Sequence, residues 1–221
     1  DRFSWVGHAS DDPDNTVVIG VSGAAVAGTF TYRGKLFKLE PRADGSQVLS
    51  EVKTTDPAPE HDPVLVPDTS SSAPDSTATA SVAADSNGAV QDVLVAYTPA
   101  VQALYGADGT DALIIQAVAE TNQAYSNSNM STRLNLVRSY LTDYTESGDM
   151  LTDLNRLRAT NDGYMDELHT IRDIYGADLV SLIGVDGQYC GIAYFMNNIS
   201  PSFAPYAFSV VSHGCATGYY S

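Results

Sequence analysis

A stretch rich in proline, serine, threonine and alanine, residues 56–89, divides this chain of 221 residues into two unlike parts. From residue 68 onward the stretch holds no aromatic residue, no lysine and no arginine. Such a composition buries too little apolar surface to offset the entropy that is lost when a chain becomes ordered. We therefore expect a flexible linker, open to proteolysis, between a first unit at residues 1–55 and a second unit at residues 90–221.

Residues 1–55 consist of short apolar runs that are separated by turns containing glycine. The run at 35–39 (KLFKL) alternates polar and apolar residues with the period of two that marks a half-buried strand. Further runs typical of strands stand at 17–21, 25–32 and 47–52. No helical period interrupts them, so we predict a β-rich domain, a meander of four or five strands.

Residues 90–221 alternate between the patterns of strands and helices. The predicted strands are 90–97, 133–141 and 177–185, and the predicted long helices are 110–125 and 149–175. We expect Gly163 to be a point where the second helix can break. The order strand, helix, strand, helix, strand predicts a mostly parallel sheet with right-handed crossovers, so the fold class is α/β here and α+β for the whole chain.

The charge of the chain excludes some classes of partner. The formal net charge is −16, from 27 acidic and 11 basic side chains. It repels nucleic-acid phosphates and anionic lipid, so we expect neither nucleic acid nor a membrane as a partner. The sequence contains no run of about 18 apolar residues, so it predicts no transmembrane helix. The phosphate-binding motifs Gly-x-Gly-x-x-Gly and the Walker loop are also absent, which argues against a nucleotide site.

Metal-ligand spacing is missing among the four histidines. None of His8, His61, His169 and His213 is followed by a second histidine or a cysteine three or four positions later. A zinc site built here would need ligands that are distant in sequence. The residues themselves therefore assign no catalytic group and no metal ligand.

The two cysteines, Cys190 and Cys215, leave two alternatives open. They are either reduced thiols in the core or one disulfide, which would close a loop of about 25 residues and contribute about 3 kcal/mol. The chain begins at Asp1 without a methionine or a signal-like segment, which we interpret as a mature or trimmed chain whose targeting segment has been removed.

Several segments of residues 90–221 resemble bacterial metzincins related to the reprolysin group, which include the peptidyl-Asp metalloendopeptidases. In order, these segments are 93–99 (VLVAYTP), 120–128 (ETNQAYSNS), 163–169 (GYMDELH), 175–180 (YGADLV), 189–194 (YCGIAY), 208–211 (FSVV) and 215–221 (CATGYYS). Residues 1–60 resemble, less specifically, the β-rich propeptide of the same secreted enzymes, through 3–7 (FSWVG) and 34–41 (GKLFKLEP).

The resemblance implies a fragment of a secreted zinc metalloendopeptidase zymogen. In such enzymes a His-Glu-x-x-His helix binds zinc, and its glutamate acts as general base on the zinc-bound water. That helix would follow within a few residues of Ser221. We therefore expect the upper part of a metzincin catalytic domain that ends before this helix. Zinc would belong to the intact parent, and the fragment would be inactive with no catalytic residue of its own.

The resemblance also implies a substrate-binding strand. Gly191, Ile192, Ala193 and Tyr194 would form the edge strand that pairs with an extended peptide or protein substrate. The alternatives are an ordinary strand or a sticky edge created by truncation. The secreted character favours the Cys190–Cys215 disulfide, which would join this edge strand to the segment leading into the zinc helix.

The propeptide would pack on the catalytic domain and block its cleft until the linker is cut. Glu60, His61 and Asp62 could supply a zinc ligand, although a polar loop is the simpler interpretation. Two rival hypotheses remain. The first is a catalytically empty secreted binding module that uses its exposed edge strand, and the second is an α/β enzyme whose site the sequence does not reveal.

Overall fold

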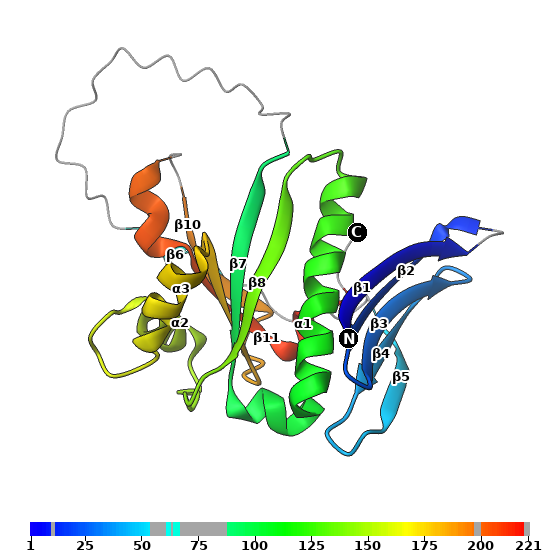
Figure 1. Cartoon of the computed structure of the whole chain (residues 1–221), viewed down its shortest axis with the longest axis horizontal. Helices are drawn as coiled ribbons and strands as arrows, with labels where there is room; N and C mark the ends of the chain where they lie inside the picture. The colour runs from blue at the N-terminus through cyan, green and yellow to red at the C-terminus, as the bar shows by residue number, and fades with distance from the viewer. Residues whose placement is uncertain (10–11, 54–60, 63, 67–87, 197–199, 219–221) are drawn as a thin grey trace, which may run out of the picture.

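The computed structural model describes residues 1–9, 12–53, 61–62, 64–66, 88–196 and 200–218 (Figure 1). Its N-terminal sheet is an antiparallel meander of five strands in chain order, as the sequence predicts. The strands are β1 (Arg2–Ala9), β2 (Asp12–Ser22), β3 (Ala25–Tyr32), β4 (Lys35–Pro41) and β5 (Gln47–Glu51).

The second sheet has six strands in the order β6-β10-β11-β9-β7-β8. The strands are β6 (Val64–Leu65), β7 (Val90–Tyr97), β8 (Arg133–Leu141), β9 (Leu179–Gly184), β10 (Gly191–Phe195) and β11 (Phe208–Ser212). Strand β7 pairs in parallel with β8 and β9, and β9 pairs in parallel with β11. Among the described strands of this sheet, the pair β10–β11 is the one antiparallel pair, so the mostly parallel sheet is confirmed.

The described helices are α1 (Pro99–Asn127), α2 (Met150–Arg158), α3 (Glu167–Tyr175) and the short 3-10 turns η1 (Pro201–Tyr206) and η2 (His213–Cys215). The prediction that the first helix begins near Thr110 is wrong. It begins after Thr98, whose side chain accepts a hydrogen bond from the Val101 amide, and Pro99 occupies the first turn. A kink at Gly106 (φ 72°) joins the added turns to the rest.

The second predicted helix is also not one long helix. Helices α2 and α3 are separated by a loop in which Gly163 (φ 83°) and Met165 (φ 54°) are left-handed. Asp166 holds this loop by accepting hydrogen bonds from the amides of Asp162 and Gly163. The left-handed backbone interrupts the helical hydrogen bonds, so the break extends well beyond Gly163.

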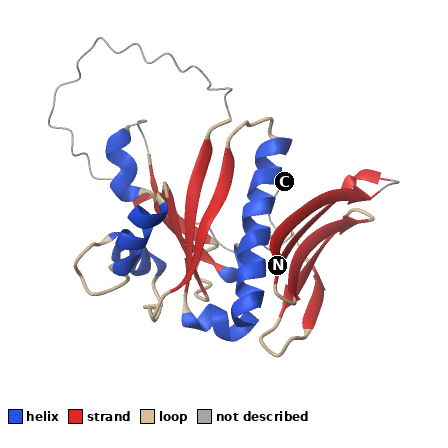
Figure 2. Ribbon diagram, in the orientation of Figure 1, coloured by secondary structure: helices blue, strands red, loops and turns tan. Residues whose placement is uncertain are grey.

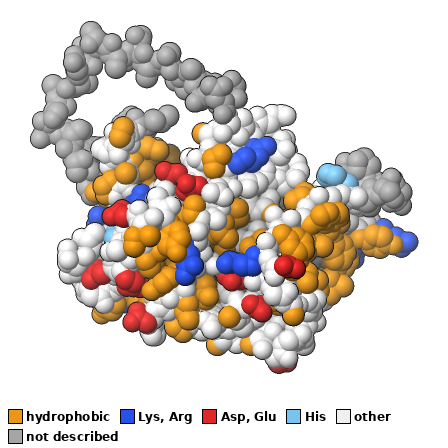
Figure 3. All heavy atoms as spheres, in the orientation of Figure 1, with side chains coloured by type: hydrophobic (Ala, Val, Ile, Leu, Met, Phe, Trp, Pro, Cys, Tyr) orange, Lys and Arg blue, Asp and Glu red, His pale blue; other side chains and the backbone are white. Residues whose placement is uncertain are grey.

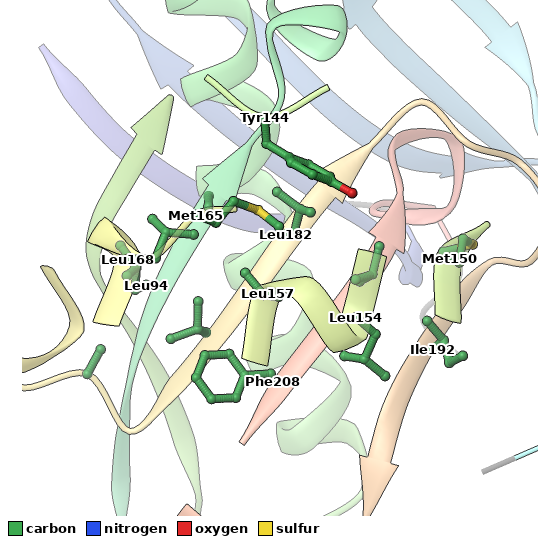
Figure 4. Packing of buried hydrophobic residues seen from close by; sticks show 14 residues of the cluster. Leu94, Tyr144, Met150, Leu154, Leu157, Met165, Leu168, Leu182, Ile192 and Phe208 are labelled. Carbon is green, nitrogen blue, oxygen red and sulfur yellow. The ribbon is translucent and has the colours of Figure 1, made fainter. Parts of the chain in front are cut away.

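The helices cover opposite faces of the second sheet, since neighbouring residues of a strand point to opposite faces. Leu94 and Ala96 of β7 pack in a cluster with Leu154 of α2 and Leu168 of α3 (Figure 4). On the other face, Val95 packs in a cluster with residues of α1. Among the described residues, no helix is both long enough and apolar enough to cross a membrane.

Helix α1 lies between the two sheets (Figures 1 and 2). The inner face of the N-terminal sheet meets it through Val18 and Ala27, which are both fully buried. Gly20 of β2 allows the close approach, because a Cβ atom there would lie 2.2 Å from the carbonyl oxygen of Ala112. On the outer face of the sheet, Phe3 and Trp5 are about half exposed, and apolar side chains gather over this region in Figure 3.

Candidate functional site

The four residues predicted to bind substrate all lie in β10 near the edge of the second sheet. Gly191, Ile192 and Ala193 pair with β11 in antiparallel register. Ile192 is buried, whereas the side chain of Ala193 is exposed. The structure thus brings Gly191–Tyr194 together on one strand. Whether this strand binds substrate stays a prediction.

The free side of β10 is partly covered by β6, which comes from the stretch expected to be a linker. Val64 lies opposite Tyr194 and Leu65 opposite Phe195 in a parallel pair. No strand was predicted between residues 56 and 89, because two paired residues are too few to produce a periodic pattern. The apolar run at 64–66 is the one sequence signal that could have indicated it.

A hollow of about 380 Å³ runs along β10, lined by residues of β10 and β11 together with His61 and Asp62. The His61 ring packs edge-on against Tyr189, with the ring centroids 4.8 Å apart. Glu60, the third residue considered as a ligand, lies outside the described residues.

The described residues do not fit a zinc ion. They contain no group of three or more His, Cys, Asp or Glu side chains that could hold a metal. His61 and Asp62 alone fall short of the three protein ligands of a typical zinc site. The described part of the chain therefore supplies no set of zinc ligands.

The structure joins Cys190 and Cys215 in a disulfide with an S–S distance of 2.03 Å. The backbone reinforces the link, since the Ser212 amide donates a hydrogen bond of 2.9 Å to the Cys190 carbonyl. The start of β10 is thereby tied to η2, as the resemblance implies. The described residues include no free cysteine.

Tyr194 connects β10 to α2. Its hydroxyl donates to Asn155 Oδ1 at 2.8 Å and accepts from Arg158 Nε at 3.2 Å. The ring of Tyr206, from η1, stands edge-on to the Tyr194 ring at 5.4 Å. Two elements, α2 and η1, thus hold this side chain in place.

A second polar cluster, the Glu120 cluster, lies between the N-terminal sheet, α1 and the C-terminal segment. Glu120 is 4% exposed. Its carboxylate accepts hydrogen bonds from Thr29 Oγ1 (2.5 Å), Gln116 Nε2 (2.7 Å) and the Gly218 amide (2.7 Å). Burial raises the pKa of Glu120, although these hydrogen bonds favour its charged form and oppose the shift.

Lys38 and His213 extend the Glu120 cluster. The ammonium of Lys38, only 6% exposed as a residue, lies 3.3 Å from Glu40 and donates to the Gly214 carbonyl. The hydroxyl of Tyr105 donates to Glu40 and lies 2.6 Å from His213 Nδ1. Burial, followed by the charge of Lys38, lowers the pKa of His213.

Sequence reasoning missed the Glu120 cluster. A weak signal exists, since Gln116 and Glu120 are polar residues one turn apart on a helix whose neighbours are apolar. Their partners Thr29 and Gly218 are distant in sequence, so periodicity cannot reveal the contact.

The chain is similar to known metallopeptidases. The profile of "Metallo-peptidase family M12B Reprolysin-like" matches residues 69–218. The peptidyl-Asp metalloendopeptidase of Xanthomonas campestris pv. campestris is 41% identical over 212 residues, which are 95% of this chain and 49% of the relative. The protein of the same description from Stenotrophomonas maltophilia is 38% identical over 216 residues, 97% of this chain and 50% of the relative.

This chain therefore spans about half the length of the curated relatives it matches. Among solved structures, metalloproteinase-II from Bacteroides fragilis is 11% identical, with a TM-score of 0.48 over 98% of this chain and 68% of that one.

Proposed function

We propose, since the chain belongs to the reprolysin-like metallopeptidase family M12B, that it is part of the zymogen of a secreted zinc metalloendopeptidase. Residues 1–55 would be the propeptide and residues 90–221 the first part of the catalytic domain. Secretion is supported by the disulfide, because such bonds persist mainly in oxidising compartments.

The pairing of β6 with β10 carries the zymogen proposal. An edge strand binds an extended peptide through its free main-chain N–H and C=O groups. Those groups serve one partner at a time, so a substrate cannot pair with Tyr194 and Phe195 while Val64 and Leu65 occupy them. The segment after the N-terminal sheet would thus occupy the proposed substrate position and hold the enzyme inactive, and the β6–β10 pairing supports this.

The zinc ligands would come from residues outside this chain. Residues 1–221 contain no His-Glu-x-x-His sequence, which in metallopeptidases supplies two zinc ligands and the general base. We therefore propose that these residues alone do not hydrolyse peptides. The relatives carry the description peptidyl-Asp metalloendopeptidase, so we propose peptides containing aspartate as the substrate class.

The test is to produce the protein from its complete gene and to assay hydrolysis of peptides that contain aspartate, with matched asparagine peptides as controls. We expect hydrolysis that a zinc chelator abolishes, that is weak before the linker is cut and that rises at least about tenfold afterwards. Hydrolysis insensitive to the chelator would contradict the proposal. A reading frame that stops at Ser221 would favour the catalytically empty binding module instead.

A further inference from the structure

Arg158, the last residue of α2, is a cation beside β10 that has no acidic partner in the part of the chain that the structure describes. Its Nε donates to the Tyr194 hydroxyl at 3.2 Å. Its guanidinium carbon lies 5.7 Å from the centre of the Tyr194 ring and 5.0 Å from that of Tyr206. Among the described residues no carboxylate lies within 4.0 Å of it, although the chain has 27 acidic and 11 basic side chains.

The guanidinium group of Arg158 is held in a fixed orientation, but most of its N–H donors are not used by the described residues. A guanidinium carries five N–H groups, and only the Nε–H has a partner among the described residues. Contact with two tyrosine rings fixes its plane, and the hydrogen bond from Tyr194 to Asn155 fixes Tyr194 in turn. The terminal nitrogens of Arg158 are therefore available to a ligand that reaches this side of β10.

The register of β6 shows which residue of a paired strand would reach Arg158. Residues directly opposite each other in a sheet place their side chains on the same face, whatever the direction of the added strand. Val64 is opposite Tyr194, and both pack against the hydrophobic cluster that includes Leu154 and Leu157 of α2. A peptide residue that replaces Val64 would thus point toward α2 and Arg158.

We propose that Arg158 is a specificity-determining residue that binds the carboxylate of an aspartate or glutamate paired opposite Tyr194. Guanidinium and carboxylate groups match in shape and form two parallel charge-assisted hydrogen bonds, which the terminal nitrogens can supply. The preferred ligand is thus an extended peptide with an acidic side chain at this position. That this peptide is a substrate rests on the proposed function.

The chain itself provides the test, since β6 already lies in the proposed subsite. Val64→Glu places a carboxylate opposite Tyr194, and Val64→Gln is a neutral control of the same size. Each is made with Arg158 and with Arg158→Gln in the full chain, and amide hydrogen exchange of residues 64–66 is measured. With Arg158, we expect the Val64→Glu variant to be protected about threefold to fivefold more than the Val64→Gln variant, and high salt to reduce the difference.

With Arg158→Gln that difference should vanish. Equal protection of the Val64→Glu and Val64→Gln variants in the presence of Arg158 would overturn the proposal. If Arg158→Gln does not fold, Arg158→Lys and the salt dependence decide, since a neutral or purely steric effect would not respond to salt. The peptidase proposal is tested separately, because this exchange experiment needs neither zinc nor hydrolysis.

Discussion

Two of the contacts between the N-terminal part of the chain and the α/β part differ in depth. The sheet contact, between β2, β3 and α1, is buried and includes Gly20 and Glu120, whose environments are closely packed. The strand contact, between β6 and β10, joins two residue pairs, of which Leu65 is 63% and Phe195 50% exposed. Local opening needs less free energy where little surface is buried, so the strand contact should open first.

This difference separates two tasks in the proposed zymogen. The sheet contact keeps the N-terminal part attached and holds the C-terminal segment through Gly214 and Gly218. The strand contact covers the edge where a peptide would bind. A strand contact that opens locally can be removed without unfolding the rest of the chain. Three substitutions test whether the sheet contact and the strand contact differ in stability as the structure indicates.

The largest expected effect follows from Gly20→Ala. Its Cβ atom would lie 2.2 Å from the Ala112 carbonyl oxygen and 2.6 Å from the Gln116 amide nitrogen, so the sheet must move away from α1. We expect a loss of about 3 kcal/mol in the free energy of unfolding, measured by urea denaturation. Gly187→Ala is the control, since nothing lies within 4 Å of its Cβ position. Equal stability of the two variants would show that the sheet is not seated on α1 as described.

A smaller loss is expected for Glu120→Ala. The substitution removes the acceptor of the buried Gly218 amide and the carboxylate near Lys38, which should cost about 2 kcal/mol. Hydrogen exchange should increase in residues 213–218, while residues 64–66 keep their protection. Glu120→Gln retains one acceptor oxygen and should lose about half as much. Unchanged exchange in 213–218 would show that the Glu120 cluster does not hold this segment.

The smallest effect concerns pH at the sheet contact. Burial lowers the folded-state pKa of His213 from its usual 6.5, so the unfolded chain binds the proton more readily and stability falls as pH drops below about 6.5. Glu120 acts in the opposite sense, because its folded-state pKa is raised and its uptake of a proton favours the folded state as pH falls toward 4.5.

The His213→Gln variant isolates the histidine contribution. Between pH 7.5 and 5.5 both melting temperatures should fall. The fall for the variant should be about 2–3 °C smaller than the fall for the unsubstituted chain. Comparing the two proteins at each pH cancels the contribution of Glu120. An identical fall in both would mean that His213 does not make the sheet contact sensitive to acid.

Several predictions from sequence were accurate because they depend on local patterns. Alternation at 35–39 and apolar runs such as 177–185 indicated strands that the structure contains. The helix boundaries were less accurate. In the sequence, Thr98 and Pro99 indicate the end of a strand. They are also the start signal of α1, and only the path of the folded chain shows that the helix begins there.

The sequence by itself determined the two-sheet organisation, most of the strands and the family, since composition, periodicity and ordered motifs are properties of neighbouring residues. Only the tertiary structure placed Val64 opposite Tyr194, Arg158 beside the same strand, and Glu120 between Thr29 and Gly218. Each of these contacts joins residues far apart in the chain. Their energies come from register, burial and charge, which arise when the elements pack together.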